Sequence, residues 1–218
     1  DNVTRILGLA RLYQDTGQLG KAQKLLRQQN QQMPDNYEIR EHLGNVQLRV
    51  YDEAIERAAA AAAQNPDDAE AAGKKADLTA RKKQFALREY KWRLQQHPTD
   101  RELQLHLGRF HFEAGDHNEA IAAFQSAAQD ARYELESCRM LGLCFMGKGQ
   151  HDLALEQFER ALKRHPDMDE QGKELRYDQA QAYEQMGNKE EALNLYKRIY
   201  SQDINFRDVT QRVDALSE

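Results

Sequence analysis

Proline, cysteine and long apolar runs are all scarce in this chain. Only four prolines occur among 218 residues, and Ala, Glu, Gln, Leu, Lys and Arg dominate, which favours helices throughout. No apolar run approaches the roughly 20 residues that a membrane-spanning helix requires, so we expect no membrane span. The sequence therefore predicts an all-α protein, with 40% apolar residues to build its core.

The two cysteines, Cys138 and Cys144, lie six residues apart on one predicted helix. A rise of about 1.5 Å per residue separates them by roughly 9 Å, which exceeds the roughly 7 Å limit for a disulfide. We expect both thiols to be reduced core residues, which is compatible with a cytoplasmic location.

Signatures of catalysis are also absent. The chain has no paired-cysteine motif, no glycine-rich phosphate-binding loop and no nucleophile elbow. Seven histidines are present, but His117 and His151 occupy equivalent positions in successive copies of a repeat, which indicates a structural role. We therefore expect no enzymatic activity, no cofactor and no metal site.

Acidic residues outnumber basic ones by 36 to 31, and a net charge of −5 disfavours non-specific binding of nucleic acid. One local exception is residues 74–93, where eight basic side chains accompany two acidic ones. This stretch is either a patch for an acidic partner or RNA, or the solvated face of a long helix. The second interpretation is favoured, because its aromatic residues suit a core better than a base-stacking surface. We expect no nucleic-acid partner.

A spacing pattern with a period of roughly 34 residues recurs along most of the chain. Its clearest copy consists of Leu141, Gly142, Phe145, Gly149, Ala154, Phe158, Ala161 and Pro166. A second copy, one period earlier, consists of Leu107, Gly108, Gly115, Ala120, Phe124 and Ala127. Within each copy the apolar positions follow helical periodicity, and the small residues allow two helices to approach closely. The pattern therefore predicts repeated helix pairs.

This pattern resembles the tetratricopeptide repeat family, over roughly residues 3–201 and most closely over 101–166. The sequence of the C-terminal segment is similar to that of bacterial members of the family. The resemblance implies an all-α fold, a right-handed α-solenoid of about six helix pairs plus a C-terminal capping helix. It also implies that the first helix of each pair lines a concave groove that binds peptides.

The resemblance predicts a single superhelical domain over residues 1–218. Its expected units are about 3–34, 35–66, 67–98, 101–132, 135–166 and 171–204, followed by a capping helix at 205–217. Unit 35–66 is two residues short between its expected helices, around Arg49–Val50. Unit 67–98 is degenerate, and no glycine, proline or asparagine lies between Lys74 and Gln96. Either this unit turns near Arg81–Lys83, or residues 68–96 form one continuous helix.

On each first helix, the residues that follow the core-facing positions form a second stripe on the adjacent face, and this stripe is predicted to line the groove. This stripe mixes arginines with apolar side chains, a composition typical of binding hot spots, and its methionine adds adaptability. The predicted peptide-binding residues are Arg109, Phe112, Arg139, Leu143, Met146, Tyr177, Asn45 and Arg11. The alternative is that these side chains simply pack between adjacent repeats.

Family members that clamp a chaperone's C-terminal carboxylate use Lys and Asn in their early repeats, where this chain offers Leu7 and Arg11. Glutamates recur instead near the start of successive first helices, at Glu38, Glu70, Glu102, Glu136 and Glu174. We expect no such clamp, and an extended peptide with acidic and apolar side chains fits better. The predicted function is a non-catalytic protein-interaction scaffold for a peptide or partner helix. The alternative is a structural self-association module, and oligomerisation is left open.

Overall fold

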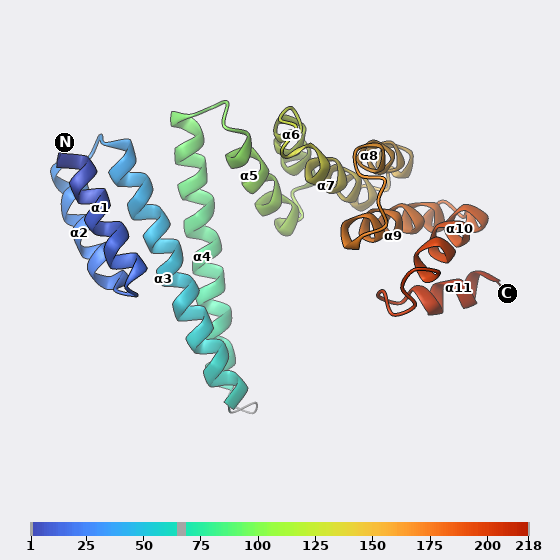
Figure 1. Ribbon diagram of the computed structural model, residues 1–218, viewed down its shortest axis with the longest axis horizontal. Coiled ribbons are helices and arrows are strands. Elements are labelled where there is room, and N and C mark those ends of the chain that lie inside the picture. Colours follow the sequence, from blue (N-terminus) through green and yellow to red (C-terminus); the bar gives the residue numbers. More distant parts are fainter. Residues whose placement is uncertain (1, 65–68, 218) are drawn as a thin grey trace. The chain divides into compact units, whose positions relative to one another are not determined.

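The computed structural model describes residues 2–64 and 69–217, and this part of the chain contains eleven α-helices and no strand (Figure 1). The chain divides into two compact units, an N-terminal unit (residues 1–96) and a C-terminal unit (residues 97–218). The helices of the N-terminal unit are α1 (Asn2–Asp15), α2 (Leu19–Gln32), α3 (Tyr37–Gln64) and α4 (Ala69–Gln96). Those of the C-terminal unit are α5 (Arg101–Ala114), α6 (His117–Ala127), α7 (Glu134–Gly147), α8 (His151–Arg164), α9 (Glu170–Gln185), α10 (Lys189–Tyr200) and α11 (Val209–Ser217).

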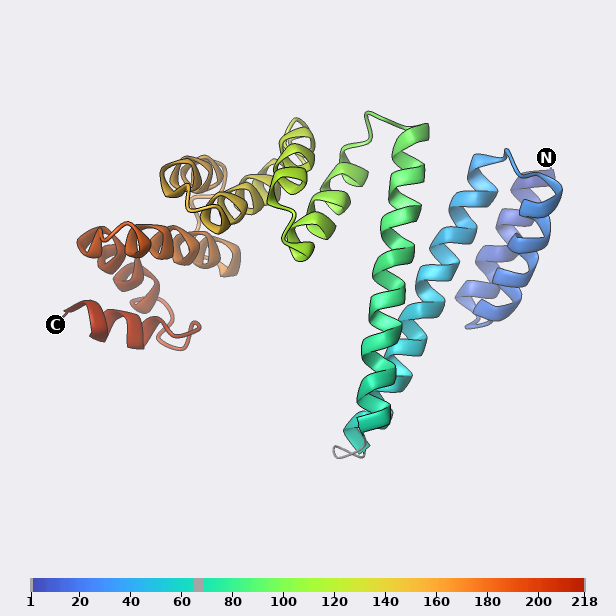
Figure 2. The same ribbon diagram turned by 180° about the vertical axis from the view of Figure 1, so that it is seen from behind.

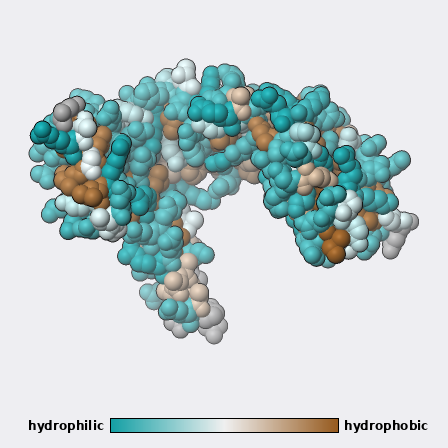
Figure 3. Space-filling model, in the orientation of Figure 1, coloured by the Kyte–Doolittle hydropathy of each residue, from teal (hydrophilic) through white to brown (hydrophobic). Residues whose placement is uncertain are grey.

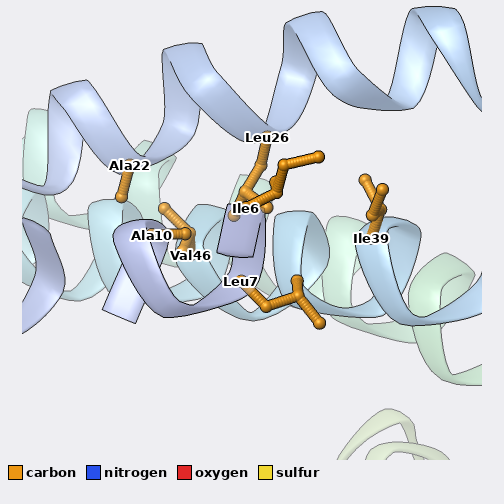
Figure 4. Packing of buried hydrophobic residues seen from close by; sticks show 7 residues of the cluster. All are labelled: Ile6, Leu7, Ala10, Ala22, Leu26, Ile39 and Val46. Atoms are coloured by element: carbon orange, nitrogen blue, oxygen red, sulfur yellow. The ribbon is translucent and has the colours of Figure 1, made fainter. Parts of the chain in front are cut away.

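The core of the N-terminal unit lies between α1, α2 and the first half of α3. Apolar side chains at helical spacing on these three helices point toward one another (Figure 4). They are Ile6, Leu7, Ala10, Ala22, Leu26, Ile39 and Val46, none more than 8% exposed. The predicted helix pair in unit 3–34 is therefore present as α1 and α2.

The two units predicted at 35–66 and 67–98 are not helix pairs. Each is one helix of 28 residues, and α3 packs against α4 as a single long hairpin. The predicted turns near Arg49–Val50 and near Arg81–Lys83 are therefore wrong. The alternative of one continuous helix is confirmed from Ala69 onward. Pro66 and Asp68, which the pattern also uses, lie outside the described residues.

The reason for this difference is the absence of a turn residue. The turns between α1 and α2, α5 and α6, α7 and α8, and α9 and α10 each contain a glycine with φ between 70° and 81°. That left-handed conformation is costly for residues with a Cβ. Residues 45–64 contain neither glycine nor proline, so α3 continues through them without a break. The described part of the chain therefore has five helix pairs and one further helix, instead of about six pairs.

The C-terminal unit follows the predicted pattern closely. Its helices α5 to α11 each pack against the next along the chain, and α7 also contacts both α5 and α9 (Figure 2). A Cβ placed on Gly108 would lie 2.6 Å from the Phe124 ring, and Gly142 faces Phe158 in the same way. Both phenylalanines are fully buried. The expected close approach of paired helices is confirmed in these two units.

The predicted capping helix at 205–217 begins later than expected, at Val209. The residues before it form turns, in which the side chain of Asp203 accepts a hydrogen bond from the backbone N–H of Asn205. Phe206 and Val209 are buried against the last helix pair. No helix in the described part of the chain has the length and apolar character needed to cross a membrane.

Replacing Gly108 with alanine should lower the free energy of unfolding by about 1–3 kcal/mol, because overpacking a tight contact costs this much. Gly20 of α2 provides the matched control, since a Cβ there would meet nothing within 4 Å. Gly20→Ala should instead stabilise its helix by about 0.5–1 kcal/mol. Urea denaturation would measure both, and equal effects of the two substitutions would contradict the close helix approach at Gly108.

Replacing Arg49 with proline should destabilise the N-terminal unit by about 3 kcal/mol or more, because proline in a helix interior removes a hydrogen bond and clashes with the preceding turn. Arg49→Ala is the control, since it removes only the exposed side chain and its 3.0 Å hydrogen bond to Gln14. Thermal unfolding followed by circular dichroism would compare the two variants. Similar stability of both would indicate a turn at this position after all.

Candidate protein-binding face

The first helices of the three C-terminal pairs, α5, α7 and α9, lie next to one another and contact each other in sequence. Their side chains form ion pairs from one helix to the next, and the last pairs reach the turn before α11. We call this surface the first-helix face. Its ion pairs involve Arg109, Glu136, Arg139, Glu174, Asp178 and Arg207.

Between α5 and α7, the Nε of Arg109 donates a hydrogen bond of 2.7 Å to Oε1 of Glu136. The two side chains are 41% and 38% exposed, so the pair lies at the surface. The hydroxyl of Tyr133, the residue before α7, donates a further hydrogen bond of 3.1 Å to Oε2 of Glu102 on α5. Exposed pairs of this kind contribute little to stability, about 0–1 kcal/mol each, but they restrict where the side chains lie.

Between α7 and α9, the Nε of Arg139 donates a 2.7 Å hydrogen bond to Oδ2 of Asp178, and the Nη1 of the same guanidinium pairs with Glu174. The Asp178 side chain is only 4% exposed. Burial raises the pKa of this carboxyl, and the guanidinium groups of Arg139 and Arg207 oppose that shift. Asp178 is therefore the most buried side chain among the ion pairs of the first-helix face.

Arg207 connects the turn before α11 to the same group of charges. Its guanidinium lies 3.2 Å from Oε1 of Glu174 and 3.7 Å from Oδ1 of Asp178. It also lies 4.7 Å from the centre of the Tyr177 ring, within the range of a cation–π contact. Arg207 has a φ of 48°, which costs a residue with a Cβ roughly 1–2 kcal/mol. These contacts hold it in that conformation.

The three predicted apolar groove residues are half-buried. Phe112 packs beside the core of α5, α6 and α7, with its ring 5.9 Å from that of His117. Leu143 and Met146 pack against a cluster that contains Ala154, Phe158 and Ala182. The alternative of packing between repeats therefore accounts for part of each side chain, and only the remaining exposed part is available to a ligand.

Tyr177 is 4% exposed, and its hydroxyl donates a hydrogen bond to Asp208. Burial raises the pKa of Tyr177, while the hydroxyl and Arg212 lower the pKa of Asp208. Tyr177 therefore supports the turn before α11 from inside the protein, and it offers no surface to a partner.

The structure places the eight predicted residues in two different units. Six of them belong to α5, α7 and α9, and only Arg11 and Asn45 belong to the N-terminal unit. Arg11 and Asn45 are both exposed, and a guanidinium nitrogen of Arg11 lies 3.5 Å from Nε2 of His42. The candidate face is therefore built on the C-terminal unit, where every predicted side chain except that of Tyr177 keeps an exposed part.

Sequence reasoning missed several residues of this face. Glu136 and Glu174 recur in the sequence near the start of first helices, but the sequence does not predict their pairing with Arg109 and Arg139. Met140 is half-buried on α7, one turn after Glu136, and packs against the core of α5, α6 and α7. Arg207 gave no signal, because it lies in a turn outside the repeats.

Other reactive side chains do not assemble into a site in the part of the chain that the structure describes. No group of three or more His, Cys, Asp or Glu residues could hold a metal ion there. Cys138 and Cys144 are free and buried, and burial raises the pKa of Cys144 to about 11. His117 and His151 each have a buried Nδ1 without a hydrogen-bond partner among the described residues.

Comparison with known proteins also indicates a helical-repeat protein. A family profile described as tetratricopeptide repeat matches residues 78–134 and 139–205. Comparison with curated protein sequences gave no match. Among solved structures, a MamA structure designated AMB-1 is 19% identical, has a TM-score of 0.60, and covers 94% of this chain and 95% of its own. A MamA double mutant designated RS-1 is 13% identical, with a TM-score of 0.62 and coverage of 93% and 97%. At these identities the likeness concerns the fold alone.

The docking of α11 should depend on pH through Asp208, whose pKa lies below its ordinary value of 3.8. A lowered carboxyl pKa contributes stability that is fully present above pH 3.8 and is lost as the pH falls through the folded-state pKa. Asp208→Asn should therefore destabilise the protein at neutral pH, and its difference from the native chain should vanish in acid. Urea midpoints across the pH range would measure this, with Asp214→Asn as the control for net charge. A difference that stays constant below pH 3.8 would contradict the role of Asp208.

Proposed function

This chain belongs to the tetratricopeptide repeat family, and from that membership we propose that it is a non-catalytic scaffold whose first-helix face binds a partner protein as an extended peptide or a helix. Tetratricopeptide repeats are generally protein-interaction modules and are typically non-catalytic. The observation that carries the proposal is the surface of α7. There Met140 and Leu143 remain half-buried on the same helix as Glu136 and Arg139, whose side chains form ion pairs with Arg109 of α5 and Asp178 of α9.

The ion pairs make this surface suitable for binding because they hold its long side chains in place. Binding normally costs about 0.5–1.5 kcal/mol for each flexible side chain that becomes ordered. Arg109 and Arg139 already contact carboxylates on the neighbouring helix, so less of this cost remains. A partner's apolar side chains would gain energy by covering the exposed parts of Met140 and Leu143.

The same pairs restrict the charge of the partner. Arg109 and Arg207 are 41% and 39% exposed, so an acidic side chain can reach them, but it competes with Glu136 and Glu174. We therefore propose that acidic side chains of the partner contribute orientation, whereas its apolar side chains contribute most of the affinity.

We also propose that residues 1–218 act as one functional repeat domain. The family match from 78 to 134 continues across the boundary between the N-terminal and C-terminal units, which supports this proposal. Within such a domain Arg11 and Asn45 remain proposed ligand contacts, since both side chains are exposed.

Exchanging the charges of one surface pair tests the binding proposal. The double variant Arg109→Glu with Glu136→Arg keeps an ion pair but reverses the position of each charge. A peptide selected against the native chain from a random display library should bind this variant about tenfold more weakly or worse, a loss of about 1.4 kcal/mol. Fluorescence anisotropy would measure the affinity, and the unfolding temperature should stay close to that of the native chain.

Lys163→Glu is the control, since it changes the charge of an exposed residue on the second helix α8. Binding of the selected peptide should be unchanged in this variant. If instead the α8 variant loses binding and the charge exchange does not, the binding surface lies on the second helices and the proposal fails. Failure to select any peptide that competes for the first-helix face would also count against it.

A further inference from the structure

The long hairpin of α3 and α4 has few fully buried apolar side chains beyond the core that it shares with α1 and α2. In the described part of the chain, no residue between 51 and 96 belongs to a hydrophobic cluster. Ala86 is the one apolar side chain of α4 that is buried in that part. An ordinary repeat helix buries several, as α8 does with Ala154, Leu155, Phe158 and Ala161.

Two ring contacts join the helices, Tyr37 with Trp92 at 5.4 Å and Tyr51 with Phe85 at 6.0 Å, and the most buried contacts between them are polar. Glu89 is 1% exposed and accepts a 2.6 Å hydrogen bond from Arg40 of α3. Arg93 is 5% exposed, donates to Glu89 over 3.1 Å and to the backbone oxygen of Glu41 over 3.0 Å. Glu89 and Arg93 occupy the space beside Gly44 that Phe124 occupies beside Gly108. These contacts lie in the half of the hairpin near α1 and α2.

The other half of the hairpin extends beyond α1 and α2 within the N-terminal unit (Figures 1 and 2). An open groove of about 570 Å³ lies there between the two helices. Small and apolar side chains contribute to it from both sides, and Figure 3 shows pale brown residues near this end of the hairpin. The groove is lined by Ala54, Arg57, Ala58 and Ala61 of α3 and by Glu70, Lys74 and Leu78 of α4.

The two helices beside this groove carry opposite charge. Residues 52–57 of α3 contain three acidic side chains and one basic one. Residues 74–83 of α4 contain five basic side chains and one acidic one. The ion pair between Lys82 and Asp52 shows that the two charged strips attract each other within one chain. Glu53, Glu56, Lys74 and Lys75 are exposed.

We propose that this half of the hairpin binds the same half of a second copy of the chain. In a two-fold arrangement, α4 of each copy lies beside α3 of the other, so that the basic strip meets the acidic strip twice. The alanines of the groove allow the helices to approach closely, and the product is a four-helix bundle that covers the exposed seam. The proposal is independent of the peptide-binding role of the first-helix face.

A second copy fits better than another partner because the surface is complementary to itself. A strongly acidic protein or a nucleic acid would be attracted by Lys74 and Lys75 but repelled by Glu53 and Glu56 on the neighbouring helix. An identical hairpin meets both strips with the opposite charge. Self-association through this surface would also cover Ala61, which is exposed, and Ala54 and Leu78, which are half-buried in one chain.

Two charge-reversed variants test the proposal on the full chain. In the basic-strip variant, Lys74→Glu and Lys75→Glu make both strips acidic, and in the acidic-strip variant, Glu53→Lys and Glu56→Lys make both strips basic. Each variant alone should dimerise at least about tenfold more weakly than the native chain, since like charges then face one another. Mixing the two variants should restore the dimer, because every acidic strip then faces a basic one. Sedimentation equilibrium over a range of concentrations would measure both effects.

Arg88→Glu with Lys91→Glu makes the same charge change on exposed residues elsewhere on α4, and this control should leave the dimer intact. Circular dichroism would verify that all variants are folded. The proposal is overturned if the native chain is a monomer at every concentration, or if the mixed variants do not associate. It is also overturned if a monomeric native chain binds single-stranded RNA and the basic-strip variant does not.

Discussion

A residue in the left-handed conformation at the turn between two helices is the constraint on which this structure depends. Gly17, Gly115, Gly149 and Gly187 each satisfy it, and at each of them the chain folds back after about four helical turns. Where such a glycine is absent, the helix continues to twice that length, as α3 shows. One local property of the backbone thus decides whether a stretch of one repeat length becomes a helix pair or half of a long hairpin.

The change in helix length also changes what holds neighbouring helices together. In two of the short pairs, α5 with α6 and α7 with α8, a glycine admits a buried phenylalanine, and the contact is apolar. In the long hairpin Gly44 admits the Glu89–Arg93 pair, whose charges must remain paired because leaving one of them alone in the interior is costly. These paired charges fix the register of the hairpin. Its other half leaves Ala61 exposed and Ala54 and Leu78 half-buried in the groove that we propose binds a second copy of the chain.

The first-helix face has a related origin. Equivalent positions in successive repeats place glutamates and arginines on adjacent helices at distances suited to ion pairs, from Arg109–Glu136 to Arg139–Asp178. The resulting surface carries ordered, mutually compensated charges around a few half-buried apolar side chains. Such a surface selects partners mainly by shape and apolar contact, with charge setting orientation.

The sequence alone determined the repeat family, the all-α fold, four of the helix pairs and the close approach of paired helices at the small residues, because these follow from a spacing pattern that recurs along the chain. Six of the eight binding residues predicted from the sequence lie on the helices of the candidate face, and their binding role stays a prediction. The continuity of α3 also has a local cause, the absence of a turn glycine, although the repeat spacing predicts a helix pair there. Only the tertiary structure decided that Tyr177 is buried and that Arg207 joins the charges of α9. These features depend on contacts between residues far apart in the sequence, and no local pattern specifies which distant side chain meets which.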